Sequence, residues 1–179
     1  MNTDFAANTQ SIPVPKLLED ILKRIHEGAR DQIAKGNEVH PVVFAFGEAA
    51  DDPGEVRVST YDVAKLMNSS QNKEVIRMMM EEAIQMDDVS IVLLVTEAWL
   101  LKLPAENVTK DEALTIRPSE HPDKEEVVLI NIMTKTAQFI ATAKIYRDPV
   151  SLSEFEVVSL TGESEGTLVR DKEDTPKIH

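Results

Sequence analysis

Apolar residues recur at steps of three and four in the segment that follows Pro15. Charged residues such as Glu19 and Lys23 occupy the positions between them. This spacing predicts an amphipathic helix with one apolar face. Gly36-Asn37 predicts its end, because glycine adopts the left-handed conformation beyond a helix without a Cβ penalty. The recurring apolar positions are Leu17, Leu18, Ile21, Leu22, Ile25, Ala29 and Ile33.

The pattern then changes to that of β-strands. Residues 39–46 are β-branched and aromatic, residues 55–60 alternate, and Asp51-Asp52-Pro53-Gly54 between them is typical of a turn. The segment therefore predicts a hairpin. Pro41 lacks an amide donor, so we expect it at the start of its strand or on a sheet edge.

Further elements follow along the chain. Residues 72–86 carry an apolar face at helical spacing and predict a second helix. Residues 89–96 are apolar at consecutive positions, which predicts a central strand covered on both faces. Alternating segments at 127–134, 138–147 and 155–160 predict three more strands.

The resulting order, α-β-β-α-β-β-β-β, lacks the β-α-β alternation of doubly wound folds. It predicts an α+β fold in which a single, mostly antiparallel sheet carries two helices on one face. A chain of 179 residues with 42% apolar residues suits one domain. We expect that domain at 13–160, preceded by a flexible N-terminal arm at 1–12 and followed by a flexible acidic C-terminal tail at 161–179.

Composition excludes several classes of function. The net charge of −13 disfavours a nucleic-acid partner. The absence of cysteine excludes disulfides, thiol catalysis and cysteine-ligated metals. The first residues lack a basic, apolar secretory signal, and the longest apolar run, residues 91–95, is far shorter than a membrane span. We therefore expect a cytoplasmic protein without a membrane partner.

Motifs for metals and cofactors are lacking. The four histidines form no pair at zinc-binding spacing, no calcium loop is recognisable, and the glycine-containing segment 162–166 lacks the lysine of a phosphate loop. We assign no cofactor, no metal ligand and no catalytic residue. Residues 81–126 hold twelve acids and four bases. A solvated face explains this local acidity better than a surface that steers basic partners or cations.

The densest polar cluster runs from Arg117 to Glu126. Its histidine lies between carboxylates and next to a serine, a combination that suits general acid–base chemistry. Two prolines bracket Ser-Glu-His, and this favours a structural role in an extended or turn conformation. The candidate binding cluster comprises Glu97, Trp99, Arg117, Ser119, Glu120, His121 and Asp123.

Two of these residues end the predicted central strand. Trp99, the single tryptophan, suits a ligand pocket or the anchor of a partner, but a lone indole more often closes the edge of a core. Glu97, if it points to a covered face, needs a partner such as Arg117 or His121, since a buried unpaired carboxylate is costly.

Glu97-Ala98-Trp99, followed by Arg117-Pro118-Ser119-Glu120-His121-Pro122-Asp123-Lys124 and a strand from Glu126, resembles a group of uncharacterised small proteins encoded in bacterial and phage genomes. The likeness spans roughly residues 39–147. It implies a small α+β domain and no particular activity.

Two hypotheses for function follow. The first is a non-catalytic, acidic binding or accessory protein, in which the region around Trp99 recognises a protein or a small ligand. An exposed apolar patch or a homodimer through a sheet edge would support it. The alternative is a hydrolase-like enzyme that uses a histidine and carboxylate pair in the 117–126 loop. We favour the binding protein, because no catalytic triad can be assembled from the sequence.

Overall fold

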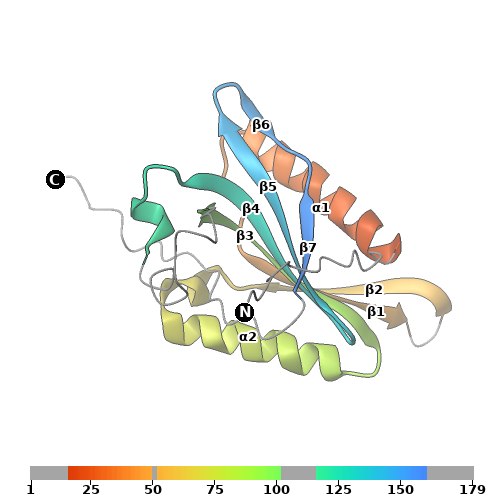
Figure 1. Ribbon diagram of the computed structural model, residues 1–179. Coiled ribbons are helices and arrows are strands. Elements are labelled where there is room, and N and C mark those ends of the chain that lie inside the picture. The colour runs from red at the N-terminus through yellow and green to blue at the C-terminus, as the bar shows by residue number, and fades with distance from the viewer. Residues whose placement is uncertain (1–15, 50–51, 102–115, 161–179) are drawn as a thin grey trace, which may run out of the picture.

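A curled antiparallel sheet with one helix on each face forms the framework of the protein (Figure 1). The computed structural model describes residues 16–49, 52–101 and 116–160. The α+β class predicted from the sequence is confirmed within these residues. The predicted arm at 1–12 and tail at 161–179 lie outside them.

The order of elements extends the predicted one by a strand and two short 3₁₀ helices. The elements are α1 (Lys16–Ala34), β1 (Val42–Ala49), β2 (Asp52–Asp62), η1 (Ala64–Asn68), α2 (Ser70–Gln85), β3 (Val89–Leu100), η2 (Pro118–Glu120), β4 (Glu125–Thr134), β5 (Gln138–Arg147), β6 (Val150–Leu152) and β7 (Glu156–Leu160). Pro41 directly precedes β1, as its missing donor predicts. The three-residue strand β6 was not predicted, because so short a segment carries no measurable alternation.

Within the described residues, the strands form one seven-stranded sheet in the order β2-β1-β3-β4-β5-β6, with β7 also paired to β5. Every pairing is antiparallel. Strand β3 lies between β1 and β4, so its predicted central position is confirmed.

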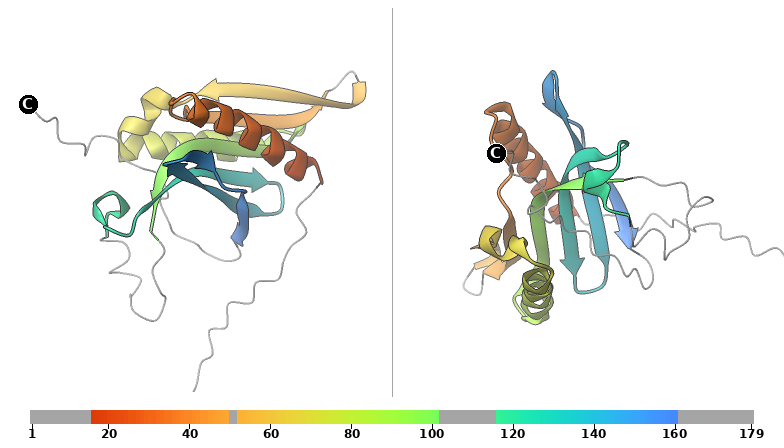
Figure 2. Two further views of the ribbon diagram at one scale, coloured as in Figure 1. Left: turned by 90° about the horizontal axis from the view of Figure 1, so that it is seen from above. Right: turned by 90° about the vertical axis from the view of Figure 1, so that its left-hand side faces the viewer.

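The prediction of two helices on one face is wrong. Helix α1 packs in one cluster with Leu93 and Val95 of β3, whereas α2 packs in another with Val92 and Leu94. Successive residues of a strand point to opposite faces. Because both sets in β3 are apolar, each face needs its own cover, and one helix lies on each side (Figure 2).

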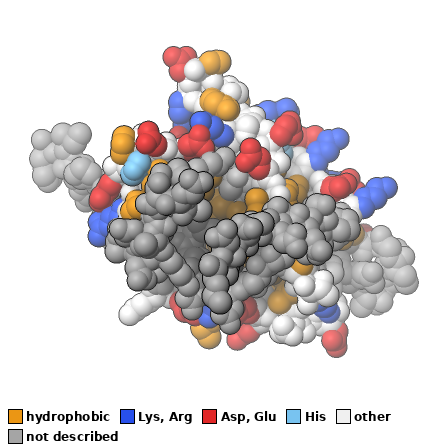
Figure 3. Space-filling model, in the orientation of Figure 1, with side chains coloured by type: hydrophobic (Ala, Val, Ile, Leu, Met, Phe, Trp, Pro, Cys, Tyr) orange, Lys and Arg blue, Asp and Glu red, His pale blue; other side chains and the backbone are white. Residues whose placement is uncertain are grey.

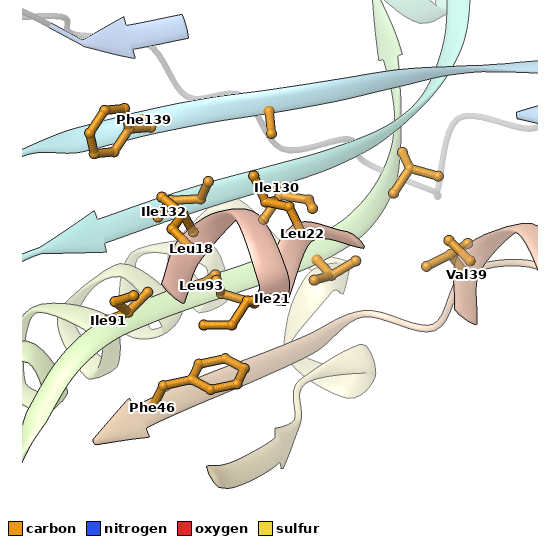
Figure 4. Close-up of a cluster of buried hydrophobic side chains, with 14 of the residues drawn as sticks. Leu18, Ile21, Leu22, Val39, Phe46, Ile91, Leu93, Ile130, Ile132 and Phe139 are labelled. Atoms are coloured by element: carbon orange, nitrogen blue, oxygen red, sulfur yellow. The ribbon is translucent and has the colours of Figure 1, made fainter. Parts of the chain in front are cut away.

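The larger core lies beneath α1. Leu18, Ile21 and Leu22 of the helix meet Ile91 and Leu93 of the central strand (Figure 4). The helix covers the sheet because its apolar residues repeat at helical spacing, as the sequence predicts. Burial of these side chains contributes about 1.5 to 3 kcal/mol each relative to exposure.

The second helix begins at a sequence-encoded cap. The Ser69 hydroxyl accepts a hydrogen bond of 3.2 Å from the amide of Asn72, which satisfies one of the free donors of the first turn. Ile76, Met80 and Ile84 then face the sheet. Neither this helix nor any other in the described part of the chain combines the length and the apolar character that a membrane span requires.

One face of the described residues is mixed in charge. On the face shown in Figure 3, acidic and basic side chains are interspersed. Such interspersion is typical of a solvated surface.

Candidate functional site

A buried carboxylate marks the end of the central strand. Glu97 of β3 is 4% exposed, and its Oε1 accepts a hydrogen bond of 2.8 Å from the backbone amide of Val39. Val39 lies in the connection between α1 and β1. Glu97 therefore joins the central strand to the segment that enters the sheet from the first helix.

Among the residues that the structure describes, Arg147 supplies the nearest positive charge to Glu97. Its Nη2 lies 3.9 Å from Oε2 of Glu97, and its Nε and Nη2 donate hydrogen bonds of 3.0 and 2.7 Å to the two carboxylate oxygens of Glu126. This two-point geometry is the strongest form of an arginine and carboxylate pair. Arg147 thus contacts Glu126 directly and Glu97 at longer range.

The three side chains meet because of strand register. Glu126 pairs with Trp99, two positions beyond Glu97 on β3, so both glutamates point to the α1 face. Arg147 ends β5, two positions after Ile145, which belongs to the cluster beneath α1. The cluster thus forms where β3, β4 and β5 run past the end of the helix-covered core.

Burial raises the pKa of the Glu97 carboxyl above its usual range, and the nearby charges of Glu126 and Glu38 add to this effect. The Val39 amide and Arg147 act in the opposite direction, because both favour the ionised form. Hydrogen bonds to Glu126 raise the pKa of Arg147, so its guanidinium stays charged.

Trp99 lies on the same face and is half-buried. The ammonium group of Lys124 lies over the indole, 4.5 Å from its centroid. The same ammonium donates to the backbone carbonyl of Ser119. Lys124 therefore holds the proline-bracketed segment against the tryptophan through a cation–π contact.

That segment forms one tight 3₁₀ turn, η2. The amides of Glu120 and His121 donate to the carbonyls of Arg117 and Pro118, at 3.0 and 3.2 Å. The Arg117 guanidinium also donates a hydrogen bond of 3.3 Å to the Glu120 carboxylate. Of the two conformations expected for the proline-bracketed segment, extended or turn, the segment therefore adopts the turn.

His121 is occupied within this turn. Its Nδ1 accepts a hydrogen bond of 3.1 Å from the backbone amide of Asp123, and it lies 3.9 Å from the Asp123 carboxylate. A neutral imidazole that accepts through Nδ1 carries its proton on Nε2. In this arrangement the ring has no free lone pair to act as a base.

The expected pairing of Glu97 with Arg117 or His121 is wrong. Among the described residues, Glu97 contacts the Val39 amide and Arg147, while Arg117 and His121 contact residues of their own turn. The sheet and the turn do converge, but through Lys124 and Trp99. Glu97 and Trp99 share a face of β3, whereas Ser119 and Glu120 lie on η2, and Arg117, His121 and Asp123 flank that turn.

Sequence reasoning missed Val39 and Arg147, and it included Glu126 in the polar cluster but not among the candidate site residues. Alternation in residues 138–147 places Arg147 on the same face as the buried Ile145, and that was the available signal. Its contact with Glu97 depends on the registers of two strand pairings, which sequence patterns do not specify.

The opposite face of the same strands carries a second ion pair. Lys144 donates to Glu125, and Lys144 also lies 5.5 Å from the centroid of Tyr146. The hydrogen bond to Glu125 raises the pKa of Lys144. Acids at the start of β4 thus pair with bases at the end of β5 on both faces, which joins the two strand ends.

This arrangement is suited to fixing structure and presenting a surface. Glu97 and His121 both use their polar atoms on backbone amides, and Lys124 uses its ammonium group on a carbonyl and an indole. Among the residues that the structure describes, no group of three or more histidine, aspartate or glutamate side chains is placed to hold a metal ion. No family model matches the sequence, and neither a curated protein nor a solved structure matches it significantly.

Proposed function

We propose that the protein is a non-catalytic binding protein whose recognition surface surrounds Trp99. The observation that carries this proposal is the Lys124 ammonium, 4.5 Å above the half-buried indole. An aromatic ring and a cation therefore lie next to each other at the end of the sheet. Aromatic side chains with one buried and one accessible part are frequent anchors of protein interfaces.

The surroundings of the indole add charge of both signs. Glu126, its cross-strand partner, is bound to Arg147, and Lys124 is exposed. A rim of paired charges around an aromatic centre is the usual anatomy of a protein interface. We therefore propose a protein as the partner rather than a small ligand.

The polar groups support binding over hydrolysis. A general base needs a lone pair aimed at the substrate, whereas Nδ1 of His121 accepts the Asp123 amide. A relay would also need Ser119 and His121 to converge with an orienting carboxylate. Among the described residues, no hydrogen bond joins the Ser119 hydroxyl to His121; the Ser119 contact seen in the turn is that of its backbone carbonyl, which accepts from Lys124.

The single tryptophan provides the test, because its fluorescence reports only on this site. The intact protein serves as bait in extracts of the cells that encode it, beside Trp99→Leu and the distant control Val75→Ala. We expect a protein that the wild type and Val75→Ala retain and Trp99→Leu loses. The purified partner should then shift the Trp99 emission.

Two results would contradict the proposal. Equal capture by Trp99→Leu would place the recognition surface elsewhere. Hydrolysis of an activated ester that is abolished by both Ser119→Ala and His121→Ala would replace binding with the hydrolase alternative.

A further inference from the structure

Strand β2 forms a long free edge of the described sheet. It lies at the end of the strand order, and its residues 56–62 pair without interruption with β1 on one side only. An edge strand presents a row of backbone donors and acceptors that another strand can use. Figure 2 shows this strand on the outer side of the hairpin.

The two ends of the sheet differ. At the far end, β5 is covered by β6, of three residues, and β7, of five residues. Short edge strands are a common protection against unwanted pairing. The regular part of β2 is longer, with seven paired residues; they contain no proline, and their charged residues are Arg57 and Asp62.

The side chains of this edge are apolar where a partner strand would cover them. Val56 and Val58 are 42% and 49% exposed, although both lie on the sheet face that carries the core beneath α1. Val58 pairs with the buried Phe46, and Thr60 pairs with Phe44. A stripe of three β-branched residues, Val56, Val58 and Thr60, thus continues the core to the open edge.

We propose that this edge binds a second copy of the same chain, with β2 antiparallel to β2 about a two-fold axis at Val58. An axis perpendicular to the sheet keeps both α1 faces on the same side. Val58 then lies opposite its own copy, and each Val56 lies opposite Thr60 of the other chain. All six residues of the joined stripe are β-branched, which suits cross-strand contact.

Neighbouring registers fit less well. A two-fold axis at Arg57 would place two guanidinium groups opposite each other. An axis at Ser59 would place the Asp62 carboxylate opposite Val56. With the axis at Val58, Arg57 lies opposite Ser59 and no like charges are opposed. Of these three registers, the one centred on Val58 avoids both like charges and a carboxylate opposite an apolar side chain, and this self-complementarity argues for a second copy as the occupant.

The charge of the chain makes this association dependent on salt. Each copy carries a net charge of −13, so two copies repel at low ionic strength. Added salt screens that repulsion while it leaves backbone pairing and apolar contact largely intact. The dimer should therefore strengthen as the salt concentration rises.

Sedimentation equilibrium of the full chain tests the proposal over about 10 μM to about 1 mM protein, the range in which a small interface associates. We expect the average mass to rise from 20.0 kDa toward twice that value. Val58→Lys should weaken the association at least about tenfold, because two lysines would face each other. Val75→Lys, a matched change on the exposed side of α2, should associate like the wild type.

A single-cysteine variant tests the register, because the natural chain has no cysteine. Val58→Cys places two thiols opposite each other at a separation that a disulfide can bridge. With diamide, which takes up the two hydrogens, it should form a covalent dimer about ten times faster than Val56→Cys or Val75→Cys.

Several results would overturn the proposal. These are a wild type that stays monomeric at every concentration and salt level, a Val58→Lys variant that associates normally, and a Val58→Cys variant that cross-links no faster than the controls. Should Val58→Lys fail to fold, the cysteine variants alone decide. Loss of capture in Trp99→Leu is a separate measurement, so failure of the dimer leaves the proposed recognition surface intact.

Discussion

The carboxylate of Glu97 accepts a hydrogen bond from the backbone amide of Val39, across 58 positions of sequence. This contact ties the exit from α1 to the end of the central strand. A backbone donor at a buried position needs an acceptor, and here a side chain supplies it. This hydrogen bond gives Glu97 a structural role in the fold.

Glu97→Ala should destabilise the protein by about 2 kcal/mol, because the buried Val39 amide loses its acceptor. Glu97→Gln should cost clearly less, since its amide oxygen can still accept the bond and no charge is buried. Urea unfolding monitored by circular dichroism measures both losses. An equal loss in the two variants would show that charge, rather than the hydrogen bond, is what the fold requires.

The raised pKa of Glu97 predicts a dependence of stability on pH. The folded protein holds this proton more tightly than the unfolded chain, whose reference pKa is 4.5. Ionisation of Glu97 therefore lowers the free energy of unfolding as pH rises from 4.5 through the raised pKa, and the effect is constant above that value. Below 4.5 both states are protonated, and Glu97 contributes no dependence.

The difference in free energy of unfolding between the wild type and Glu97→Gln isolates this effect, because all other groups titrate in both proteins. Measured from about pH 4 to about pH 7.5, the wild type should lose stability relative to Glu97→Gln. A relative gain would mean that Arg147 and the Val39 amide outweigh burial, and that the pKa is lowered.

Arg147→Ala should lower stability at neutral pH by about 1 kcal/mol, a value already reduced for the half-exposed position of the side chain. Its loss leaves Glu97 and Glu126 without their shared cation. The effect should shrink in a Glu97→Gln background, which a double-mutant cycle measures. Arg57→Ala, which removes a more exposed ion pair with Asp88, is the control and should change stability little. Additive losses in the cycle would show that Arg147 acts only through Glu126.

His26 of α1 contacts the segment between the last two strands, β6 and β7. Its Nε2 donates a hydrogen bond of 2.8 Å to the carbonyl of Ser153, and its ring meets Phe155 edge-on at 5.5 Å. His26→Ala should cost about 1 to 2 kcal/mol and should accelerate amide exchange in residues 150–157. His40→Ala, which removes an exposed imidazole paired with Asp62, should leave that exchange unchanged. Equal exchange in both variants would show that His26 does not hold this segment.

Local periodicity predicted the helices and most strands, because each buries a face whose spacing is visible in the chain. Residues 89–96 even signalled a strand with two covered faces, which is incompatible with two helices on one side. Two covered faces of the central strand predict one helix on each face of the sheet, which is where α1 and α2 lie. The short strand β6 had no such signal.

The partners of the predicted cluster could not be obtained in this way. Lys124 and Trp99 meet because the turn folds back over β3, and Glu97 meets Arg147 because two registers align. Both depend on contacts distant in sequence. Charge and burial predicted that Glu97 needs a partner, but only the sheet determines which residue provides it.

Two glycines provide a matched test of the packing between β1 and the turn before β3. A Cβ added at Gly47 would lie 1.8 Å from the carbonyl oxygen of Asp88, which belongs to the backbone and cannot move aside cheaply. Gly47→Ala should therefore destabilise the protein by about 3 kcal/mol or more, as overpacking against a rigid group does. Gly28, in the interior of α1, has open space around the same position, so Gly28→Ala should stabilise the protein by about 0.5 to 1 kcal/mol. Thermal unfolding of the two variants should shift in opposite directions. If Gly47→Ala leaves thermal stability unchanged, the turn at Asp88 must move to accommodate the added methyl group. The packing between β1 and β3 would then be less tight than the structure describes.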